Sequence, residues 1–365
     1  MKAVRDLMQR GVTDGVFPGG VLLVARKERV EFLEAFGRAR LDPERPMTTD
    51  TVFDLASFTK PLATTLATMV LVQDGRLDLD QTLGSAISDF SGTDKAEIAV
   101  RQLLSHTSGL PDYQPYYKEL IKLPPSERKA SLRKLLVAER LIHAPGQTCL
   151  YSDVGFMILE WLVEVSTGRP LDDFVQETLY RPLKLKDLFF VPLNDAKGRK
   201  DYPYAATEDC PWRGKILDGE VHDDNAYAVG GVAGHAGLFG TAQAVYVLLQ
   251  ELFNTYLGKP NAVIFHQDLV QTFFQRQPGP GSWALGFDTP TQPDSSSGRY
   301  FSDQSVGHLG FTGTSFWVDL LKGVMVILLT NRIHPNRENE RIKAFRPLLH
   351  DTVVDSILGQ SSSTS

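Results

Sequence analysis

Short apolar, β-rich runs lie near both ends of the chain. Residues 21–25 and 30–36 flank a charged turn, and residues 316–320 and 324–329 flank Lys322-Gly323. Runs of this length separated by a turn predict β-hairpins. We therefore expect one hairpin near each end of the chain.

Two helices are predicted outside these hairpins. Residues 1–20 have the pattern of a short polar helix that ends in a glycine-proline turn, and residues 341–358 have the pattern of an amphipathic helix. Residues 37–46 and 278–299 carry loop composition. Both termini are therefore expected to build one sheet that helices cover.

The middle of the chain has helical spacing instead. It is found at residues 98–104, 126–141, 153–167 and 171–180. Proline or glycine breaks the pattern between these stretches. The sequence therefore predicts an all-helical domain, residues 96–225, inserted into an α/β domain of residues 1–95 plus 226–358. Residues 359–365 are Ser/Thr-rich, which predicts a disordered tail.

Composition limits the classes of partner. Apolar residues make up 42% and charged residues 22%, with a formal net charge of −6, as expected for an ordinary globular protein. No long basic run is present, so we expect no nucleic-acid partner. No apolar stretch is long enough to span a bilayer. The composition does not predict an oligomeric state.

The N-terminus bears on cellular location, and the number and spacing of the cysteines bear on disulfides and metal sites. Residues 1–20 lack the apolar segment of a secretory signal, so we expect a cytoplasmic protein as the sequence stands, or a periplasmic one if a leader has been removed. Cys149 and Cys210 are too few and too far apart for a disulfide framework or a zinc site, and we interpret them as buried thiols.

The first chemical motif is Ser57-Phe58-Thr59-Lys60, followed by Pro61 and a helical stripe. Proline is tolerated in the first turn of a helix, so the helix is expected to begin near Ser57. Lys60 then falls on the same face as the hydroxyl. A desolvated lysine with a lowered pKa can take the hydroxyl proton and make Ser57 a nucleophile. The alternative is a helix-capping serine with a solvated lysine.

Two further motifs carry groups suited to this chemistry. Tyr151 lies just before a predicted helix, where it can project into a cleft and relay protons, or simply pack at the helix entrance. The segment 307–317 is rich in glycine and begins a strand, so its N–H groups can bind an oxyanion. His308 in that segment can polarise a substrate or play a purely structural role.

These motifs resemble the three active-site boxes of class C β-lactamase-like serine hydrolases, a family that includes penicillin-binding carboxypeptidases and esterases. The boxes are Ser57-Phe58-Thr59-Lys60, Tyr151-Ser152-Asp153 and His308-Leu309-Gly310. Segments 103–110 and 165–171 also resemble the family. Segments 222–225 and 230–239 are similar to an esterase- and amidase-like branch.

The resemblance implies an α+β fold, in which helices flank an antiparallel sheet, with a helical domain and the active site between them. It implies that Ser57 is acylated, that Lys60 activates it and that Tyr151 carries the proton. The Ser57 and Phe311 N–H groups would form the oxyanion hole. The remaining site positions that it implies are Asp153, Gly310 and Thr312 for substrate binding and His308 for catalysis.

Two departures from the family pattern bear on the substrate. Asp153 stands where asparagine is common, and an ionised carboxylate only accepts hydrogen bonds. His308 stands where β-lactamases often have lysine, and a neutral imidazole attracts a substrate carboxylate more weakly. We therefore expect an ester or a peptide-like amide in preference to a β-lactam, although β-lactams and other peptidoglycan-derived substrates stay open.

Two other functions compete with the serine hydrolase. A penicillin- or peptidoglycan-binding protein would be acylated with little turnover. A metallohydrolase would use His222, Asp223 and His235, possible ligands for zinc or manganese. Because no HExxH spacing is present, we expect these residues and Asp224 to form a loop that lines the cleft, with no metal and no cofactor.

Overall fold

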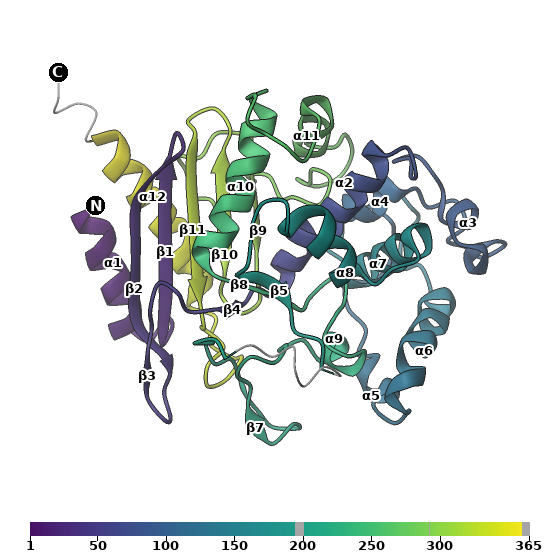
Figure 1. The fold of residues 1–365 in the computed structure, drawn as a ribbon, viewed down its shortest axis with the longest axis horizontal. Helices are drawn as coiled ribbons and strands as arrows, with labels where there is room; N and C mark the ends of the chain where they lie inside the picture. The colour runs from purple at the N-terminus through teal and green to yellow at the C-terminus, as the bar shows by residue number, and fades with distance from the viewer. Residues whose placement is uncertain (194–200, 292, 360–365) are drawn as a thin grey trace.

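The centre of the protein is a six-stranded antiparallel sheet (Figure 1). The computed structural model describes residues 1–193, 201–291 and 293–359. The strand order is β3-β2-β1-β11-β10-β9. The strands are β1 Gly19–Arg26, β2 Arg29–Arg40, β3 Arg45–Pro46, β9 Ser305–Leu309, β10 Ser315–Asp319 and β11 Val324–Thr330. The two predicted hairpins thus lie side by side, and both termini build one sheet as expected.

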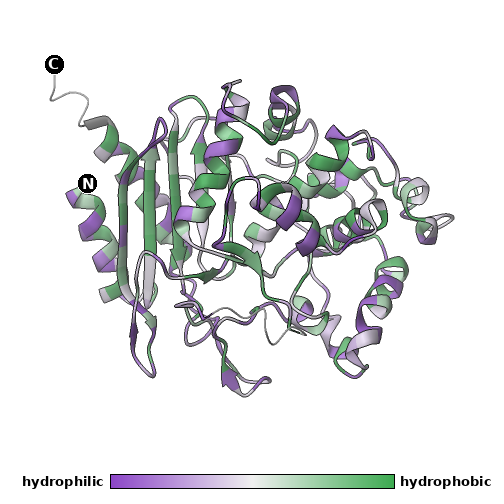
Figure 2. Cartoon of the chain, viewed as in Figure 1, coloured by the Kyte–Doolittle hydropathy of each residue, from purple (hydrophilic) through white to green (hydrophobic). Residues whose placement is uncertain are grey.

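Strand β1 is buried on both faces, which explains why it is an unbroken apolar run. Leu22 and Val24 face a core shared with α1 Lys2–Thr13 and α12 Ile342–Gly359. Val21 and Leu23 face the main core, where α10 Ala242–Tyr256 packs. Figure 2 shows β1 and β11 as the apolar centre of this layered arrangement.

The loop predicted over residues 37–46 is found only at residues 41–44, because β2 continues to Arg40 and pairs with β3. Gly37, the first residue of that predicted loop, has a φ of +71° and lies opposite Gly19 in the ladder. A Cβ at Gly37 would lie 2.2 Å from the Pro18 carbonyl oxygen. Glycine is therefore needed here for close approach of the backbones. The described part of 278–299 forms no named helix or strand, as predicted.

Helices gather on the side of the molecule remote from α1 and α12 (Figure 1). They are α2 Leu66–Gln73, α3 Leu83–Ala86, α4 Val100–Leu104, α5 Tyr117–Leu120, α6 Pro125–Ala138, α7 Asp153–Thr167 and α8 Leu171–Val175, with a π-helical turn at Gln176–Tyr180. The four helices predicted in this region are confirmed. The domain bounds stay a prediction, and α2 contacts α7 and α8 although it precedes residue 96.

Short elements connect the sheet to these helices. The three strands β4-β8-β5 and the pair β6-β7 form two small antiparallel sheets. The remaining elements are β4 Phe53–Asp54, β5 Leu188–Phe190, β6 Asp209–Cys210, β7 Lys215–Ile216, β8 Leu238–Gly240, α9 Asp224–Ala228, α11 Gln267–Phe274 and the 3-10 turns Ala56–Phe58 and Ser88–Phe90. Strand β4 leads directly into Ser57, and β8 follows His235, so their pairing brings the two segments together.

The C-terminal helix reaches one residue into the predicted tail. Gly359 is the last residue of α12, whereas the tail was predicted to begin there. Residues 360–365 lie outside the described residues. Among the helices of the described chain, none combines the length and apolar character that crossing a bilayer requires.

Candidate active site

Ser57 lies at the start of a continuous helical segment, as the position of Pro61 predicted. A 3-10 turn at Ala56–Phe58 is followed by a π-helical stretch, Lys60–Thr65, and then by α2. Pro61 occupies the first turn, where its missing N–H costs no intrahelical bond. Ser57 Oγ and Lys60 Nζ are 3.2 Å apart. The hydroxyl and the amine are therefore in contact.

Ala56, immediately before Ser57, has a strained backbone. Its φ is +48°, in the left-handed region that residues with a Cβ rarely adopt. The buried carboxylate of Asp54 accepts hydrogen bonds from the Ala56 N–H at 2.8 Å and from the His222 N–H at 2.7 Å. The Thr59 hydroxyl donates to the Ala56 carbonyl at 2.7 Å. These bonds hold the turn that presents Ser57.

The Lys60 ammonium is fully buried, and it has three partners. They are Asp153 Oδ1 at 2.7 Å, the His235 carbonyl oxygen at 3.1 Å and Ser57 Oγ at 3.2 Å. An ammonium has three N–H donors, so this set can satisfy all of them. In the resting site Ser57 Oγ therefore accepts a hydrogen bond from a charged lysine.

The condition under which Lys60 would act as a base, a pKa lowered by burial, is not met in this resting geometry. Burial does oppose the charge, but the Asp153 carboxylate and the neighbouring Tyr151 outweigh it, and the pKa of Lys60 lies above its ordinary value. The main cause of the raised pKa is Asp153, which was expected to bind substrate. Its carboxylate forms the ion pair with Lys60 and is also one wall of the cavity.

Tyr151 stands at the entrance of α7, where the Ser152 hydroxyl caps the helix by accepting the Gly155 N–H at 3.1 Å. Lys60 Nζ lies 4.8 Å from the centre of the Tyr151 ring. The buried phenol oxygen lies beside Ser57 and Lys60, without a hydrogen bond of good geometry to any described residue. Burial raises the pKa of Tyr151, although the Lys60 charge acts in the opposite direction. The phenol is therefore protonated in the resting site.

Three rings that surround Tyr151 hold it in place. Those of His106 and Trp283 lie 4.7 and 5.5 Å from it, and that of His308 lies 5.9 Å away. His106 Nδ1 accepts the Ser152 N–H at 3.0 Å, which ties this ring to the start of α7. Sequence analysis assigned no site role to His106 or Trp283. The signal for His106 was its family-like segment, whereas Trp283 lies in a loop without any motif.

His308 lies beside Tyr151, but it is buried and does not line the cavity. Its Nδ1 lies 2.7 Å from the Leu309 carbonyl oxygen and must donate to it, which leaves Nε2 as an unpaired acceptor. Burial, aided by the charge of Lys60, lowers the pKa of His308 to about 3. The imidazole is therefore neutral and gives a substrate carboxylate no fixed positive charge.

The expected oxyanion groups are available. Among the described residues, the N–H groups of Ser57 and Phe311 donate to no protein acceptor, and both residues line the cavity. Gly310 and Thr312 do not line it. The Gly310 N–H donates to the Thr314 carbonyl at 2.8 Å, and the Thr312 hydroxyl donates to the Asp54 carbonyl at 2.9 Å. These two residues hold the strand end in place.

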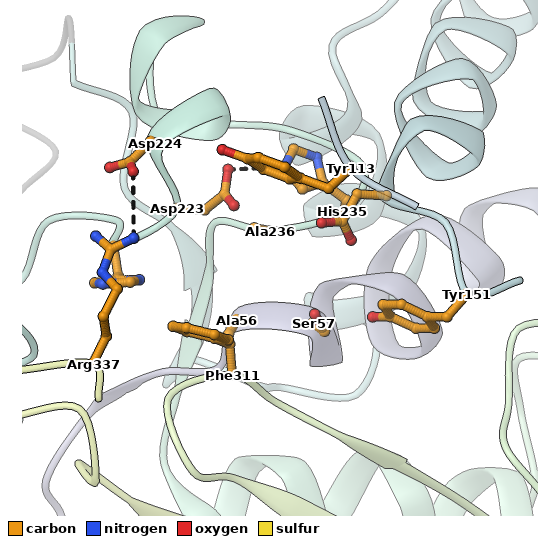
Figure 3. A pocket seen from close by; sticks show the side chains of 12 residues that line it. Ala56, Ser57, Tyr113, Tyr151, Asp223, Asp224, His235, Ala236, Phe311 and Arg337 are labelled. Carbon is orange, nitrogen blue, oxygen red and sulfur yellow. Dashed lines mark hydrogen bonds and ion pairs between the residues drawn. The ribbon is translucent and has the colours of Figure 1, made fainter. Parts of the chain in front are cut away.

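A cavity of about 380 Å³ opens above Ser57. It is lined by Ala56, Ser57, Tyr113, Tyr151, Asp153, His222, Asp223, Asp224, His235, Ala236, Phe311 and Arg337. Figure 3 shows Ser57 and Tyr151 toward one end and Asp224 with Arg337 at the other. The structure thus brings four predicted residues, Ser57, Tyr151, Asp153 and Phe311, to one cavity, with Lys60 buried beside them.

The residues of the metal hypothesis do not form one cluster but belong to two separate side-chain pairs. His235 Nε2 lies 2.8 Å from Asp223 Oδ1, and His222 Nε2 lies 3.2 Å from Glu208 Oε2. Among the described residues, no group of three or more His, Cys, Asp or Glu side chains is arranged to hold a metal. His222, Asp223 and His235 line the cavity, as the alternative interpretation of this segment expected.

The comparisons with known proteins agree in fold and chemistry. The family model "Beta-lactamase" matches residues 4–350. "N-acetylmuramyl-L-alanine amidase" of Bacillus subtilis (strain 168) is 33% identical, with 92% of this chain and 81% of that protein covered. "Putative D-alanyl-D-alanine carboxypeptidase" of Escherichia coli (strain K12) is 32% identical, with 87% and 79% covered.

Solved structures share the fold. "EstCE1, a hydrolase with promiscuous acyltransferase activity" has a TM-score of 0.72 at 24% identity, with 95% of this chain and 98% of that chain covered. The octameric penicillin-binding protein homologue from Pyrococcus abyssi has a TM-score of 0.74 at 18% identity, with 98% and 77% covered.

Proposed function

The chain belongs to the beta-lactamase family and is a serine hydrolase, and from this premise we propose that Ser57 attacks an amide bond in a peptidoglycan-derived substrate. The observation that carries this proposal is the contact of 3.2 Å between Ser57 Oγ and Lys60 Nζ, beside the protonated phenol of Tyr151. This geometry suits a nucleophile with a proton carrier on each side.

The proposed reaction requires one proton fewer than the resting site holds. Lys60 and Tyr151 act as one titrating unit, which must first release a proton to solvent. Ser57 Oγ then bonds to the acyl carbon, and its proton passes to this unit. The C–N bond breaks as Tyr151 protonates the leaving nitrogen, and water attacks the acyl-enzyme by the reverse route. The Ser57 and Phe311 N–H groups stabilise the oxyanion in both steps.

Two features favour an amide without a nearby carboxylate. Among the described residues that line the cavity, Arg337 is the one lysine or arginine. Its positive charge is already paired with the Glu208 carboxylate, to which Nε and Nη2 donate. His308 is neutral and lies outside the cavity. A carboxypeptidase substrate or a β-lactam carries a carboxylate beside the scissile bond, so a muramyl-alanine type of amide fits better. The relative named as an amidase supports this choice.

The proposal is tested by labelling and turnover together. The wild-type protein and its Ser57→Ala and Lys60→Ala variants are incubated with a fluorophosphonate and, separately, with a penicillin, and adducts are located by mass spectrometry. We expect a fluorophosphonate adduct on Ser57 that Lys60→Ala suppresses. Steady release of amine from a muramyl peptide is expected in parallel.

Other results would point to the competing functions. A penicillin adduct with a burst of product and no steady turnover would favour a protein that is acylated and hardly hydrolyses. Full activity in Ser57→Ala that is lost with a chelator would favour a metallohydrolase. Cytoplasmic or periplasmic location stays a prediction and is tested by cell fractionation.

A further inference from the structure

The cavity extends well beyond the atoms needed for bond cleavage. Figure 3 shows Ser57 and Tyr151 toward one end and Asp224 and Arg337 at the other, with the Tyr113 ring between them and its hydroxyl directed toward Asp224. We call Tyr113, Asp223, Asp224 and Arg337 the distal subsite. A ligand group bonded to the acyl carbon would extend into it.

Tyr113 is an exposed aromatic side chain that the protein leaves unengaged. It is 41% exposed and lines the cavity. Within the described chain, no other ring packs against it and no side chain or backbone group bonds its hydroxyl. Burial of the hydroxyl raises its pKa, so it is a neutral donor and acceptor. An open ring face beside a hydroxyl is suited to stacking with an amphipathic ring.

The other exposed ring of the cavity, Phe311, is already held. The His222 ring is stacked on it at 5.6 Å, and the Arg332 guanidinium lies 4.7 Å from its centre. Figure 3 shows Phe311 on the side of the cavity opposite Tyr113. Phe311 therefore provides a fixed wall, whereas Tyr113 provides the platform.

Polar atoms remain available around this platform. Asp223 Oδ1 binds His235 and the Ala226 N–H, which leaves Oδ2 as an acceptor. Arg337 Nη1 has only a 3.6 Å contact with Asp224 in addition to the bonds from Nε and Nη2 to Glu208. A purely aromatic group would bury these charged atoms without partners, which is unfavourable. A ring that carries hydroxyl or acetamido groups could bond them.

Resting on the proposed function, we propose that the distal subsite binds the pyranose ring of a muramyl substrate, stacked on Tyr113 and hydrogen-bonded by Asp223 and Arg337. The subsite would then select glycan-bearing amides over bare peptides that contain the same scissile bond. The apolar face of the sugar meets the tyrosine ring, and its polar edge meets the carboxylate and the guanidinium.

The test compares two substrates that differ only by the sugar. Muramyl dipeptide and lactoyl-alanyl-isoglutamine share the scissile amide, and amine release gives kcat/KM for each. We expect the wild-type protein to prefer the muramyl form by at least tenfold. Tyr113→Ala should reduce that ratio to below about threefold, and Tyr113→Phe, which keeps the ring, should restore most of it. Tyr300→Ala, an exposed tyrosine outside the cavity, is the matched control.

Binding to Ser57→Ala, measured by calorimetry, separates this inference from the proposed function. Muramyl dipeptide should bind more tightly than the lactoyl peptide, and adding Tyr113→Ala should remove the difference. Equal binding of both ligands would overturn the sugar subsite even if Ser57 is acylated normally. A phenylacetyl peptide that binds as well as the muramyl form would also overturn it, because the subsite would then accept any apolar ring. Sugar-dependent binding without turnover would support the subsite and contradict the proposed hydrolysis.

Discussion

Lys60 Nζ and Asp153 Oδ1 form a 2.7 Å ion pair inside the candidate active site. Lys60 is fully buried, and its remaining contacts are neutral oxygen atoms. The carboxylate therefore keeps a proton on the amine that is proposed to activate Ser57. Asp153 also lines the cavity, so a substrate that bonded this carboxylate would weaken its hold on Lys60. In the proposed mechanism, substrate binding and activation of the nucleophile would thus be connected through one side chain.

Replacing Asp153 by asparagine should shift the pH dependence of acylation. Without the carboxylate, burial dominates and the pKa of Lys60 falls. The rising acid limb of kcat/KM for an aryl ester should then move down by about one pH unit or more in Asp153→Asn. The measurement is the initial rate between pH 5 and 10. Asp173→Asn, an exposed position in α8, should leave the limb in place. An unmoved limb in Asp153→Asn would show that another group controls the step.

Tyr151→Phe should slow acylation by about 10²- to 10⁴-fold, the usual contribution of a positioned proton carrier. The ring contacts with His106 and Trp283 do not involve the hydroxyl, so the fold should be kept. Stopped-flow labelling with a fluorophosphonate measures the rate, and circular dichroism checks the fold. A folded variant that is acylated at the wild-type rate would remove Tyr151 from the mechanism.

Asp54→Ala should destabilise the protein and also reduce the reactivity of Ser57. The buried carboxylate accepts from the N–H groups of Ala56 and His222, and its loss leaves both without that acceptor. We expect a loss of about 3 kcal/mol in the free energy of unfolding, measured with urea. Asp50→Ala, at an exposed position nearby in sequence, is the control and should change it by less than about 0.5 kcal/mol. Equal effects of the two substitutions would contradict this role.

Glu208 should contribute stability that depends on pH in the acid range. Burial opposes its charge, but hydrogen bonds from His222 and Arg337 lower the pKa of Glu208 to about 2. A carboxylate with a depressed folded-state pKa stabilises the fold above its unfolded pKa of about 4.3 and loses that effect as the pH falls toward 2. The difference in Tm between the wild-type protein and Glu208→Gln should therefore be largest at pH 6 and shrink below pH 4.5. A difference that stays constant from pH 6 to 3 would exclude this linkage.

Local patterns predicted much of the fold and several residues of the cavity. Helix α7 begins and ends where the sequence indicated, because Ser152 caps it and Gly168 adopts a φ of +70° after it. The start of a helix near Ser57 was likewise predicted from a local signal, the position of Pro61. These signals lie within a few residues of the feature that they predict, so no knowledge of the tertiary structure was needed.

What the sequence could not predict depends on contacts between distant segments. Tyr113, Trp283 and Arg337 come from loops without a motif, and only folding brings them near Tyr151 or into the cavity. The raised pKa of Lys60 could not be predicted for the same reason. Burial could be anticipated from the helix, but the identity of the partner, Asp153, could not.

The pairing of β1 with β11 also has a consequence for biosynthesis. Arg26 lies opposite Val324 and Gly20 opposite Thr330, so the second neighbour of the apolar strand β1 leaves the ribosome long after β1 itself. Until then, the N-terminal hairpin carries an open edge with the potential for intermolecular association. Nascent chains that stop before β11 should therefore aggregate or depend on chaperones, and the six-stranded sheet becomes accessible only after β11 has been translated.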